Sequence, residues 1–143
     1  MKIAIIPARG GSKRIPKKNI KNFLGKPIIA YSIELAINCG LFDKVIVSTD
    51  SKEISKIATQ YGAQIPFLRP KELADDFTGT HEVIGHVIKS LEKNNYKINY
   101  ACCIYPTAPL IKKNDIIKGF KLLKNEKWDT VIAATSYSYP VHR

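Results

Sequence analysis

The sequence predicts an α/β protein built around a doubly wound, mostly parallel sheet. Short apolar runs alternate along the chain with longer segments whose apolar residues recur at helical spacing. Glycine, proline and cap-forming residues stand at the junctions between these segments. Strand and helix patterns that alternate in this way are typical of parallel strands joined by right-handed helical crossovers.

The first two elements are a strand and a helix. Lys2–Ile6 is an apolar run that ends at Pro7, as expected for a buried strand that leads into a loop. Beyond that loop, Ile28–Cys39 follows Pro27 directly and carries apolar residues at helical spacing. Gly40 comes next and is a preferred residue at the end of a helix, so we expect a helix over Ile28–Cys39.

The same order continues along the rest of the chain. Lys44–Ser48 is rich in β-branched residues and predicts a second strand. Asp50 is followed by Glu53 in a pattern like a capping box, so we interpret Asp50 as the cap of a helix that ends at Tyr61–Gly62. The remaining predicted elements are strands at Ile65–Leu68, Tyr100–Tyr105 and Thr130–Ala134, and helices at His81–Asn94 and at Asn114–Asn125, capped by Asn114.

The composition indicates one globular domain. The 143 residues, 45% of them hydrophobic, suffice for a single core, and no repeat or linker interrupts them. No apolar run approaches the roughly 20 residues of a membrane span, so we expect a cytoplasmic protein with no membrane partner. The cysteines form no CxxC pair and the histidines lack ligand spacing, which predicts structural thiols and no metal role for either residue type.

Positive charge is concentrated near the N-terminus. The net charge is +11, and residues 1–33 contain eight basic and no acidic side chains. The other 110 residues carry 15 basic and 12 acidic side chains, which is an ordinary surface balance. Charge confined to one loop favours a compact polyanion such as a nucleoside triphosphate, and it argues against nucleic acid, which would require a broader basic face.

The loops after the predicted strands form the candidate site. Ligands of parallel sheets bind beyond the carboxyl ends of the strands. In the first loop, Gly10 and Gly11 predict positive φ angles and backbone N–H groups aimed at phosphate, with donors supplied by Arg9, Ser12 and Lys13. Neither a GxxxxGK[ST] nor a GxGxxG pattern is present, so this is not one of the common phosphate loops.

Four stretches in the chain carry a family resemblance. They are Pro7–Ile20 followed by Gly25-Lys26-Pro27, then Val47–Asp50, Arg69–Asp76 and Tyr105–Pro109. Together, and in this order, they resemble the motifs of sugar-acid cytidylyltransferases, the family of the CMP-sialic acid synthetases. The resemblance implies a Rossmann-like nucleotidyltransferase fold of the nucleotide-diphospho-sugar transferase type, with residues 1–143 as its N-terminal, nucleotide-binding part.

The resemblance also implies an activity and a set of site residues. CMP would pass from CTP to the anomeric hydroxyl of an acidic nine-carbon sugar, with release of pyrophosphate, through positioning and neutralisation of phosphate charge. Catalytic roles would fall to Arg9, Lys13 and Lys18, whereas Lys17 and Lys21 are interpreted as solvated loop charges. The nucleotide would be bound by Ala8, Gly10, Gly11, Ser12, Asn19, Arg69, Asp76, Thr80, Tyr105 and Thr107.

Metal and partners follow from the same resemblance. The family uses Mg²⁺ held by a downstream Asp-x-Asp motif, which this sequence lacks, so we expect no metal ligands within residues 1–143. Asp50 and Asp76 would be the first candidates for metal ligands if the metal site were built within residues 1–143. We therefore expect this segment alone to be inactive as a catalyst, and the full-length protein to be a homodimer with CTP and a sugar acid as its substrates.

Two departures from the sialic-acid pattern bear on the sugar. Tyr105 stands where a Gln is usual, and Arg14 stands where a Gly is usual. Both resemble family members that act on pseudaminic acid, so we expect that sugar, with N-acetylneuraminic acid or another sugar acid as the alternative. A second enzyme alternative is a nucleotidyltransferase for a neutral sugar phosphate, which would share Gly25-Lys26-Pro27. A remote alternative is a basic nucleic-acid-binding module.

Overall fold

The computed structural model describes residues 1–125 and 127–136. The chain divides into two compact units, Met1–Ile111 and a second that begins at Lys112. The prediction of a single domain stays a prediction, and each unit is described by itself. Among the described residues, no helix combines the length and the apolar character needed to cross a membrane.

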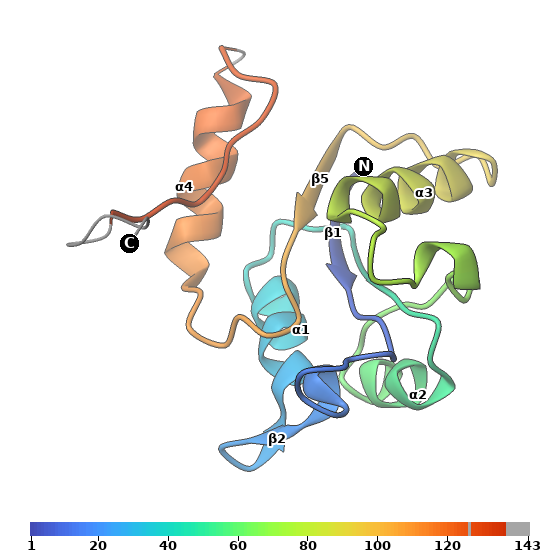
Figure 1. Ribbon diagram of the computed structural model, residues 1–143. Coiled ribbons are helices and arrows are strands. Elements are labelled where there is room, and N and C mark those ends of the chain that lie inside the picture. Colours follow the sequence, from blue (N-terminus) through green and yellow to red (C-terminus); the bar gives the residue numbers. More distant parts are fainter. Residues whose placement is uncertain (126, 137–143) are drawn as a thin grey trace. The chain divides into compact units, whose positions relative to one another are not determined.

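The first unit has the predicted alternation of strands and helices (Figure 1). Its main elements are β1 (Lys2–Pro7), α1 (Ile28–Asn38), β4 (Lys44–Ser48), α2 (Lys52–Gln60), α3 (Thr80–Glu92) and β5 (Tyr100–Cys103). Two short antiparallel strands, β2 (Asn22–Phe23) and β3 (Lys26–Pro27), form a hairpin before α1, and single 3₁₀ turns lie at Lys18–Ile20 and Lys71–Leu73.

The sheet is parallel, with the strand order β4-β1-β5. The chain therefore passes from β1 to β4 on one side and later returns to β5 on the other side of β1. Such a reversal is the switch point at which open α/β sheets bind their ligands, beyond the carboxyl end of the central strand. The α/β class and the parallel sheet are confirmed, and the topology places the candidate site after Pro7.

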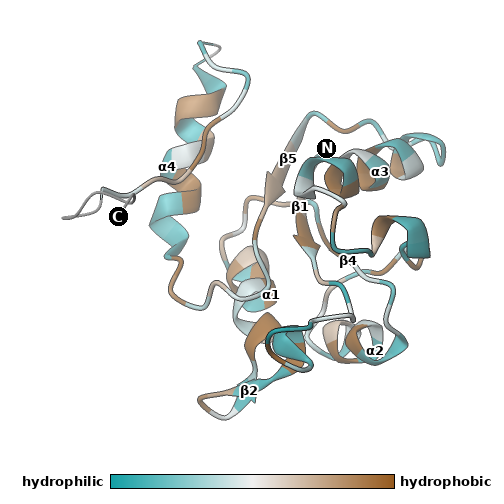
Figure 2. Cartoon of the chain, in the orientation of Figure 1, coloured by the Kyte–Doolittle hydropathy of each residue, from teal (hydrophilic) through white to brown (hydrophobic). Residues whose placement is uncertain are grey.

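The core holds β1 in place from both faces. Ile3 and Ile5 pack against Val87 and Leu91 of α3. The intervening residues of β1 point to the opposite face and are also fully buried, and α1 contacts both β1 and β4. β1 and β5 are accordingly brown in Figure 2. Each buried isoleucine contributes about 1.5–3 kcal/mol, so the loop that follows β1 starts from a rigid point.

The predicted strand at Ile65–Leu68 is wrong. Only one residue, Gln64, makes a parallel bridge, to Ile46 of β4. Pro66 has no N–H to donate to a ladder, and the chain bends there. The backbone regains contact at Arg69, whose N–H donates to the Thr49 carbonyl at 2.8 Å. This segment therefore follows β4 without extending the sheet.

Two predicted helix caps are also wrong. Ser51 is the N-cap of α2, and its Oγ accepts from the Ile54 N–H at 3.3 Å. The carboxylate of Asp50 accepts instead from the Gly10 N–H at 2.8 Å. In the second unit, α4 (Lys113–Lys124) starts after Lys112, which makes no side-chain cap, and Asn114 lies inside the helix. The N-cap lies one residue after the predicted Asp50 in α2 and two residues before the predicted Asn114 in α4.

The second unit contains no strand among its described residues. Thr130–Ala134, predicted as a strand, has no regular secondary structure. A β-branched run becomes a strand only when another strand supplies its hydrogen-bond partners, and the described residues after Ile111 include none. This prediction is therefore wrong for the structure.

Candidate functional site

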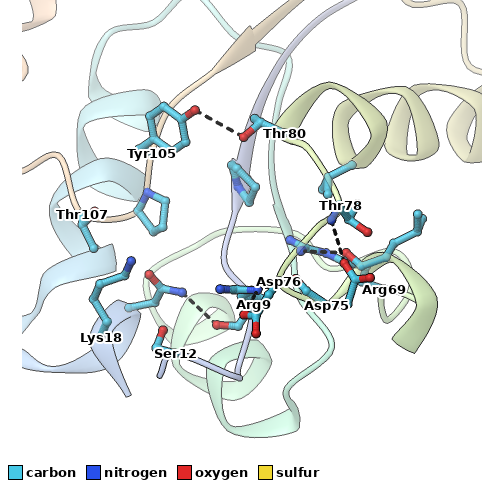
Figure 3. A pocket seen from close by; sticks show the side chains of 15 residues that line it. Arg9, Ser12, Lys18, Arg69, Asp75, Asp76, Thr78, Thr80, Tyr105 and Thr107 are labelled. Atoms are coloured by element: carbon cyan, nitrogen blue, oxygen red, sulfur yellow. Dashed lines mark hydrogen bonds and ion pairs between the residues drawn. The ribbon is translucent and has the colours of Figure 1, made fainter. Parts of the chain in front are cut away.

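A pocket of about 240 Å³ opens at the carboxyl end of β1 (Figure 3). It lies wholly within the first unit, and its walls come from the loop after β1, the segment between α2 and α3, the start of α3, and the loop after β5. The lining residues are Pro7, Arg9, Ser12, Lys18, Asn19, Arg69, Leu73, Asp75, Asp76, Thr78, Thr80, Val83, Tyr105, Pro106 and Thr107. The loops predicted after Ile6, Leu68 and Tyr105 therefore meet at one place, whereas the loop after Ser48 supplies no lining residue.

Most of the predicted site residues line this pocket. These are Arg9, Ser12, Lys18, Asn19, Arg69, Asp76, Thr80, Tyr105 and Thr107. Ala8 is fully buried behind the wall, and Gly10, Gly11 and Lys13 lie outside the lining. Six lining residues were not among the predicted site residues: Pro7, Leu73, Asp75, Thr78, Val83 and Pro106. Leu73 and Asp75 lie within the Arg69–Asp76 motif and could have been included on that ground.

Arg9, Lys13 and Asp76 form a charged cluster at the pocket. Arg9 Nη1 lies 2.8 Å from Asp76 Oδ1, and Lys13 Nζ forms an ion pair with Asp76 Oδ2. The hydrogen bond from Lys13 is the largest cause that lowers the pKa of the Asp76 carboxyl below its ordinary value, and the hydrogen bond from Arg9 acts in the same direction. Because this pKa is lower in the folded state, the stabilisation is present at neutral pH and is lost as the pH falls through the folded-state value.

The segment that carries Asp76 is braced by its neighbours. Asp75 Oδ1 accepts from the backbone N–H of Phe77 at 3.1 Å and of Thr78 at 2.7 Å. Hydrogen bonding by Thr78 keeps the pKa of Asp75 below its ordinary value. Glu82 Oε2 accepts from the Gly79 N–H at 2.7 Å where α3 begins. The turn is thus closed without the carboxylate of Asp76.

Arg69 lies beneath the pocket as a buried cation. The residue is 6% exposed. Its Nε donates to Ser48 Oγ at 3.1 Å, its Nη2 to the Ser48 carbonyl at 2.5 Å, and its Nη1 to the Leu73 carbonyl at 3.4 Å. Burial lowers its pKa, while the charge of Asp50 acts in the opposite direction. Arg69 therefore joins the end of β4 to the turn at Lys71–Leu73, and it adds positive charge beneath the pocket.

Asn19 presents an unused acceptor. Its Nδ2 donates to the Arg9 carbonyl at 2.9 Å, which fixes the orientation of the amide. Its Oδ1 is buried and has no hydrogen-bond partner. Because a buried unpaired oxygen is costly, the arrangement favours a ligand that carries a donor at this point.

Tyr105 and Thr80 close another side of the pocket, and their hydroxyl oxygens lie 3.3 Å apart (Figure 3). Ser32 of α1 is fully buried and donates to the Tyr105 carbonyl at 2.8 Å. The backbone of Tyr105 is thereby anchored while its ring stays 57% exposed. The hydroxyl pair is available to a polar ligand.

The glycines of the first loop do not have the predicted backbone conformation, and Gly10 has a packing role. Neither Gly10 nor Gly11 has a positive φ; Gly25, Gly40 and Gly62 do. The Gly10 N–H is occupied by Asp50 and does not point freely at a ligand. A Cβ at Gly10 would lie 3.0 Å from the Ser51 Cβ, so glycine is required there for close packing against the start of α2.

We expect Gly10→Ala to destabilise the fold by about 1–2 kcal/mol, because Ser51 must shift away from an added methyl group. Gly11→Ala is the matched control, since a Cβ at Gly11 would meet nothing within 4 Å. Urea unfolding of both variants measures the difference. Equal midpoints for the two variants would show that the contact with Ser51 does not constrain the loop.

The described residues do not form a metal site. They contain no group of three His, Cys, Asp or Glu side chains that could hold an ion. Near the pocket, the carboxylate of Asp76 is held by two cations and that of Asp50 by the Gly10 N–H. These carboxylates do not fit a preformed Mg²⁺ site, and we assign no step to the metal.

Burial raises the pKa of Cys102 to about 11, in agreement with a structural thiol.

Comparison with known proteins gives a consistent set of matches. A family model described as cytidylyltransferase matches residues 3–140. The pseudaminic acid cytidylyltransferase of Campylobacter jejuni subsp. jejuni serotype O:23/36 is 45% identical over 141 residues, which cover 99% of this chain and 61% of that protein. The N-acylneuraminate cytidylyltransferase of Escherichia coli O18:K1:H7 is 40% identical over 139 residues, which cover 96% of this chain and 32% of that protein.

A solved structure supports the fold. A CMP:2-keto-3-deoxy-manno-octonic acid synthetase complexed with CTP superposes with a TM-score of 0.74 at 20% identity, covering 87% of this chain and 48% of that one. The similarity confirms the Rossmann-like nucleotidyltransferase fold. The chain spans about three fifths of the length of the Campylobacter relative.

Proposed function

This chain belongs to the cytidylyltransferase family, and on that premise we propose that the protein transfers CMP from CTP to the anomeric hydroxyl of an acidic nine-carbon sugar. The anomeric oxygen forms a bond to the α-phosphorus, and the bond from that phosphorus to the bridging oxygen breaks. Pyrophosphate leaves, and the hydroxyl proton is released. The product is a CMP-sugar, an activated donor for cell-surface or flagellar glycan synthesis.

The observation that carries the proposal is the convergence of donors on one pocket at the switch point. Arg9, Lys18 and Arg69 line it together with the hydroxyls of Ser12, Thr80 and Thr107. Charge that builds on phosphate oxygens in the transition state is stabilised by fixed donors of this kind. In the proposed complex Arg9 and Lys13 contact the leaving phosphates, and Lys18 contacts the oxygens of the phosphoryl group under attack.

The ribose and base would occupy the remaining walls. The unpaired Oδ1 of Asn19 would accept from a hydroxyl or amino group of the nucleoside. The hydroxyl pair of Thr80 and Tyr105 offers both donor and acceptor capacity on the opposite wall. These assignments require a nucleoside as well as phosphate, which distinguishes the proposed site from a simple anion pocket.

Pseudaminic acid is the sugar that we propose. Tyr105, one of the two departures from the sialic-acid pattern, lines the pocket, whereas Arg14 lies exposed outside the lining. The 45% identity to a pseudaminic acid cytidylyltransferase supports the same choice. N-acetylneuraminic acid is the alternative, because the Escherichia coli relative is nearly as similar. We also propose a cytoplasmic homodimer that uses Mg²⁺ with ligands outside the described residues.

Pyrophosphate release by the whole protein tests the activity and the sugar together. With CTP, we expect pseudaminic acid to be used with a kcat/KM at least about tenfold above that for N-acetylneuraminic acid, since polar groups left unpaired by the wrong sugar penalise it. A neutral sugar phosphate serves as the control substrate and should give no release. Equal use of both acids would refute the sugar assignment, and release only with the sugar phosphate would refute the reaction.

A further inference from the structure

Asp76 occupies the place where the cations of the first loop would meet phosphate. One of its carboxylate oxygens contacts Arg9 and the other contacts Lys13 (Figure 3 shows Arg9 and Asp76). Arg9 also donates to the Asp75 carbonyl. Both cations assigned to the leaving phosphates are therefore bound to an internal anion in this structure.

The surrounding turn does not depend on this carboxylate. Asp75 closes the turn by accepting from Phe77 and Thr78, and the Thr78 hydroxyl donates to the Glu72 carbonyl at 3.2 Å. The Asp76 carboxylate instead contacts Arg9 and Lys13. The side chain thus leaves a preformed turn and reaches toward the first loop.

The ion pairs of Asp76 with Arg9 and Lys13 are exposed enough for a phosphate ligand to displace them. The side chains of Arg9, Asp76 and Lys13 are 33%, 32% and 80% exposed, so water and salt screen the ion pairs. A triphosphate carries several negative charges and many acceptor oxygens, whereas the carboxylate carries one charge and two oxygens. Phosphate therefore competes with Asp76 for the same donors and holds the advantage.

We propose that Asp76 is an internal counter-ion of the phosphate cradle, defined as Arg9, Ser12 and Lys13, and that it lowers the affinity of the empty site for polyphosphate until a nucleotide replaces it. The identification of the cradle rests on the proposed function. Nucleotide binding then separates the Asp75–Thr78 turn from the first loop. Because of this exchange, the single charge of Asp76 partly neutralises the two cations of the free cradle, and compact anions with less charge than a triphosphate compete with it less well.

Two other roles for Asp76 predict different results. If the carboxylate held Arg9 and Lys13 in their binding positions, its removal would weaken phosphate binding. If it bound a metal ion alongside the nucleotide, its removal would have no effect without divalent metal and would weaken binding in its presence. Phosphate binding measured in the presence of a chelator therefore reports the competition between Asp76 and phosphate, without a contribution from metal binding.

Asp76→Asn in the whole protein tests the proposal by titration calorimetry in the presence of EDTA. We expect inorganic tripolyphosphate and CTP to bind about two- to fivefold more tightly than to the wild type, the range that the loss of exposed ion pairs allows. Cytidine, which has no phosphate, should bind equally to both proteins. Glu53→Gln is the matched control, because Glu53 pairs with Lys17 of the same loop at 2.8 Å and its loss removes the same charge.

Unchanged or weaker tripolyphosphate binding by Asp76→Asn would overturn the proposal, as would an equal gain in Glu53→Gln, which would indicate a general charge effect. A wild type that binds neither tripolyphosphate nor CTP in EDTA would overturn it as well, whereas the proposed function is tested separately by pyrophosphate release in the presence of Mg²⁺. If the wild type binds both ligands and the Asn variant gains nothing, only the counter-ion role fails.

Discussion

Arg9→Ala is expected to lower kcat/KM for CTP by about ten- to a hundredfold. A charge-assisted contact to phosphate contributes about 1.5–3 kcal/mol, and the guanidinium of Arg9 lines the pocket directly after the rigid end of β1. Lys13→Ala should act in the same direction by at least about tenfold, although its side chain is 80% exposed before the nucleotide binds. Pyrophosphate release at varied CTP gives both values.

The control for this prediction comes from the same basic stretch. Lys21→Ala removes the same charge from a residue that lies outside the pocket lining, and it should change kcat/KM by less than about twofold. A thermal melt of each variant separates lost binding from lost folding. Titration curves for Arg9→Ala and Lys13→Ala that overlay the wild-type curve would contradict the assignment of these residues to phosphate.

The sheet could be predicted because apolar runs bounded by breakers leave few alternatives. Lys44–Ser48 was predicted with the bounds that the structure has, and Lys2–Ile6 falls short of β1 by one residue. Both strands are buried, and burial requires a continuous apolar run. The segment at Ile65–Leu68 is also apolar, but Pro66 prevents the ladder, and Leu68 remains 45% exposed.

The β2–β3 hairpin was missed because its turn carries an atypical residue. Leu24 has φ 48° and Gly25 has φ 92°, the two positive angles of a tight hairpin turn. Asn or Asp normally precedes the Gly in such turns, so the Leu-Gly pair gives a weak signal. Here tertiary contacts select the turn: Phe23 packs edge-on against Tyr31 of α1, whose hydroxyl donates to the Phe23 carbonyl at 2.8 Å.

The site was predictable as far as the loop motifs reached, and less so where packing decides. Polar side chains after strand ends can be located from the sequence, because parallel strands bring their carboxyl ends to one edge. The partner of Asp50 could not be located, since the contact with Gly10 spans forty positions of the chain. The partners of Arg69 could not be located either: the resemblance places Arg69 among the nucleotide ligands, and in the structure it lines the pocket and also donates to Ser48 Oγ and to the carbonyls of Ser48 and Leu73.

These hydrogen bonds predict a large effect of Arg69 on stability. Arg69→Met should lower the free energy of unfolding by about 2–3 kcal/mol, because Ser48 Oγ and the Leu73 carbonyl lose donors in a buried place. Relief of the desolvation of the guanidinium offsets part of this loss, which is why the expected value is moderate for three hydrogen bonds.

Arg69→Lys distinguishes charge from geometry. A single ammonium cannot reproduce the fork that reaches Ser48 Oγ, the Ser48 carbonyl and the Leu73 carbonyl together, so Lys should recover little of the loss. Arg14→Met is the matched control, an exposed arginine whose replacement should change stability by less than about 0.5 kcal/mol. Urea unfolding monitors all three variants. A Lys variant as stable as the wild type would mean that positive charge beneath the pocket, and not the joining of β4 to the turn at Lys71–Leu73, is what this position supplies.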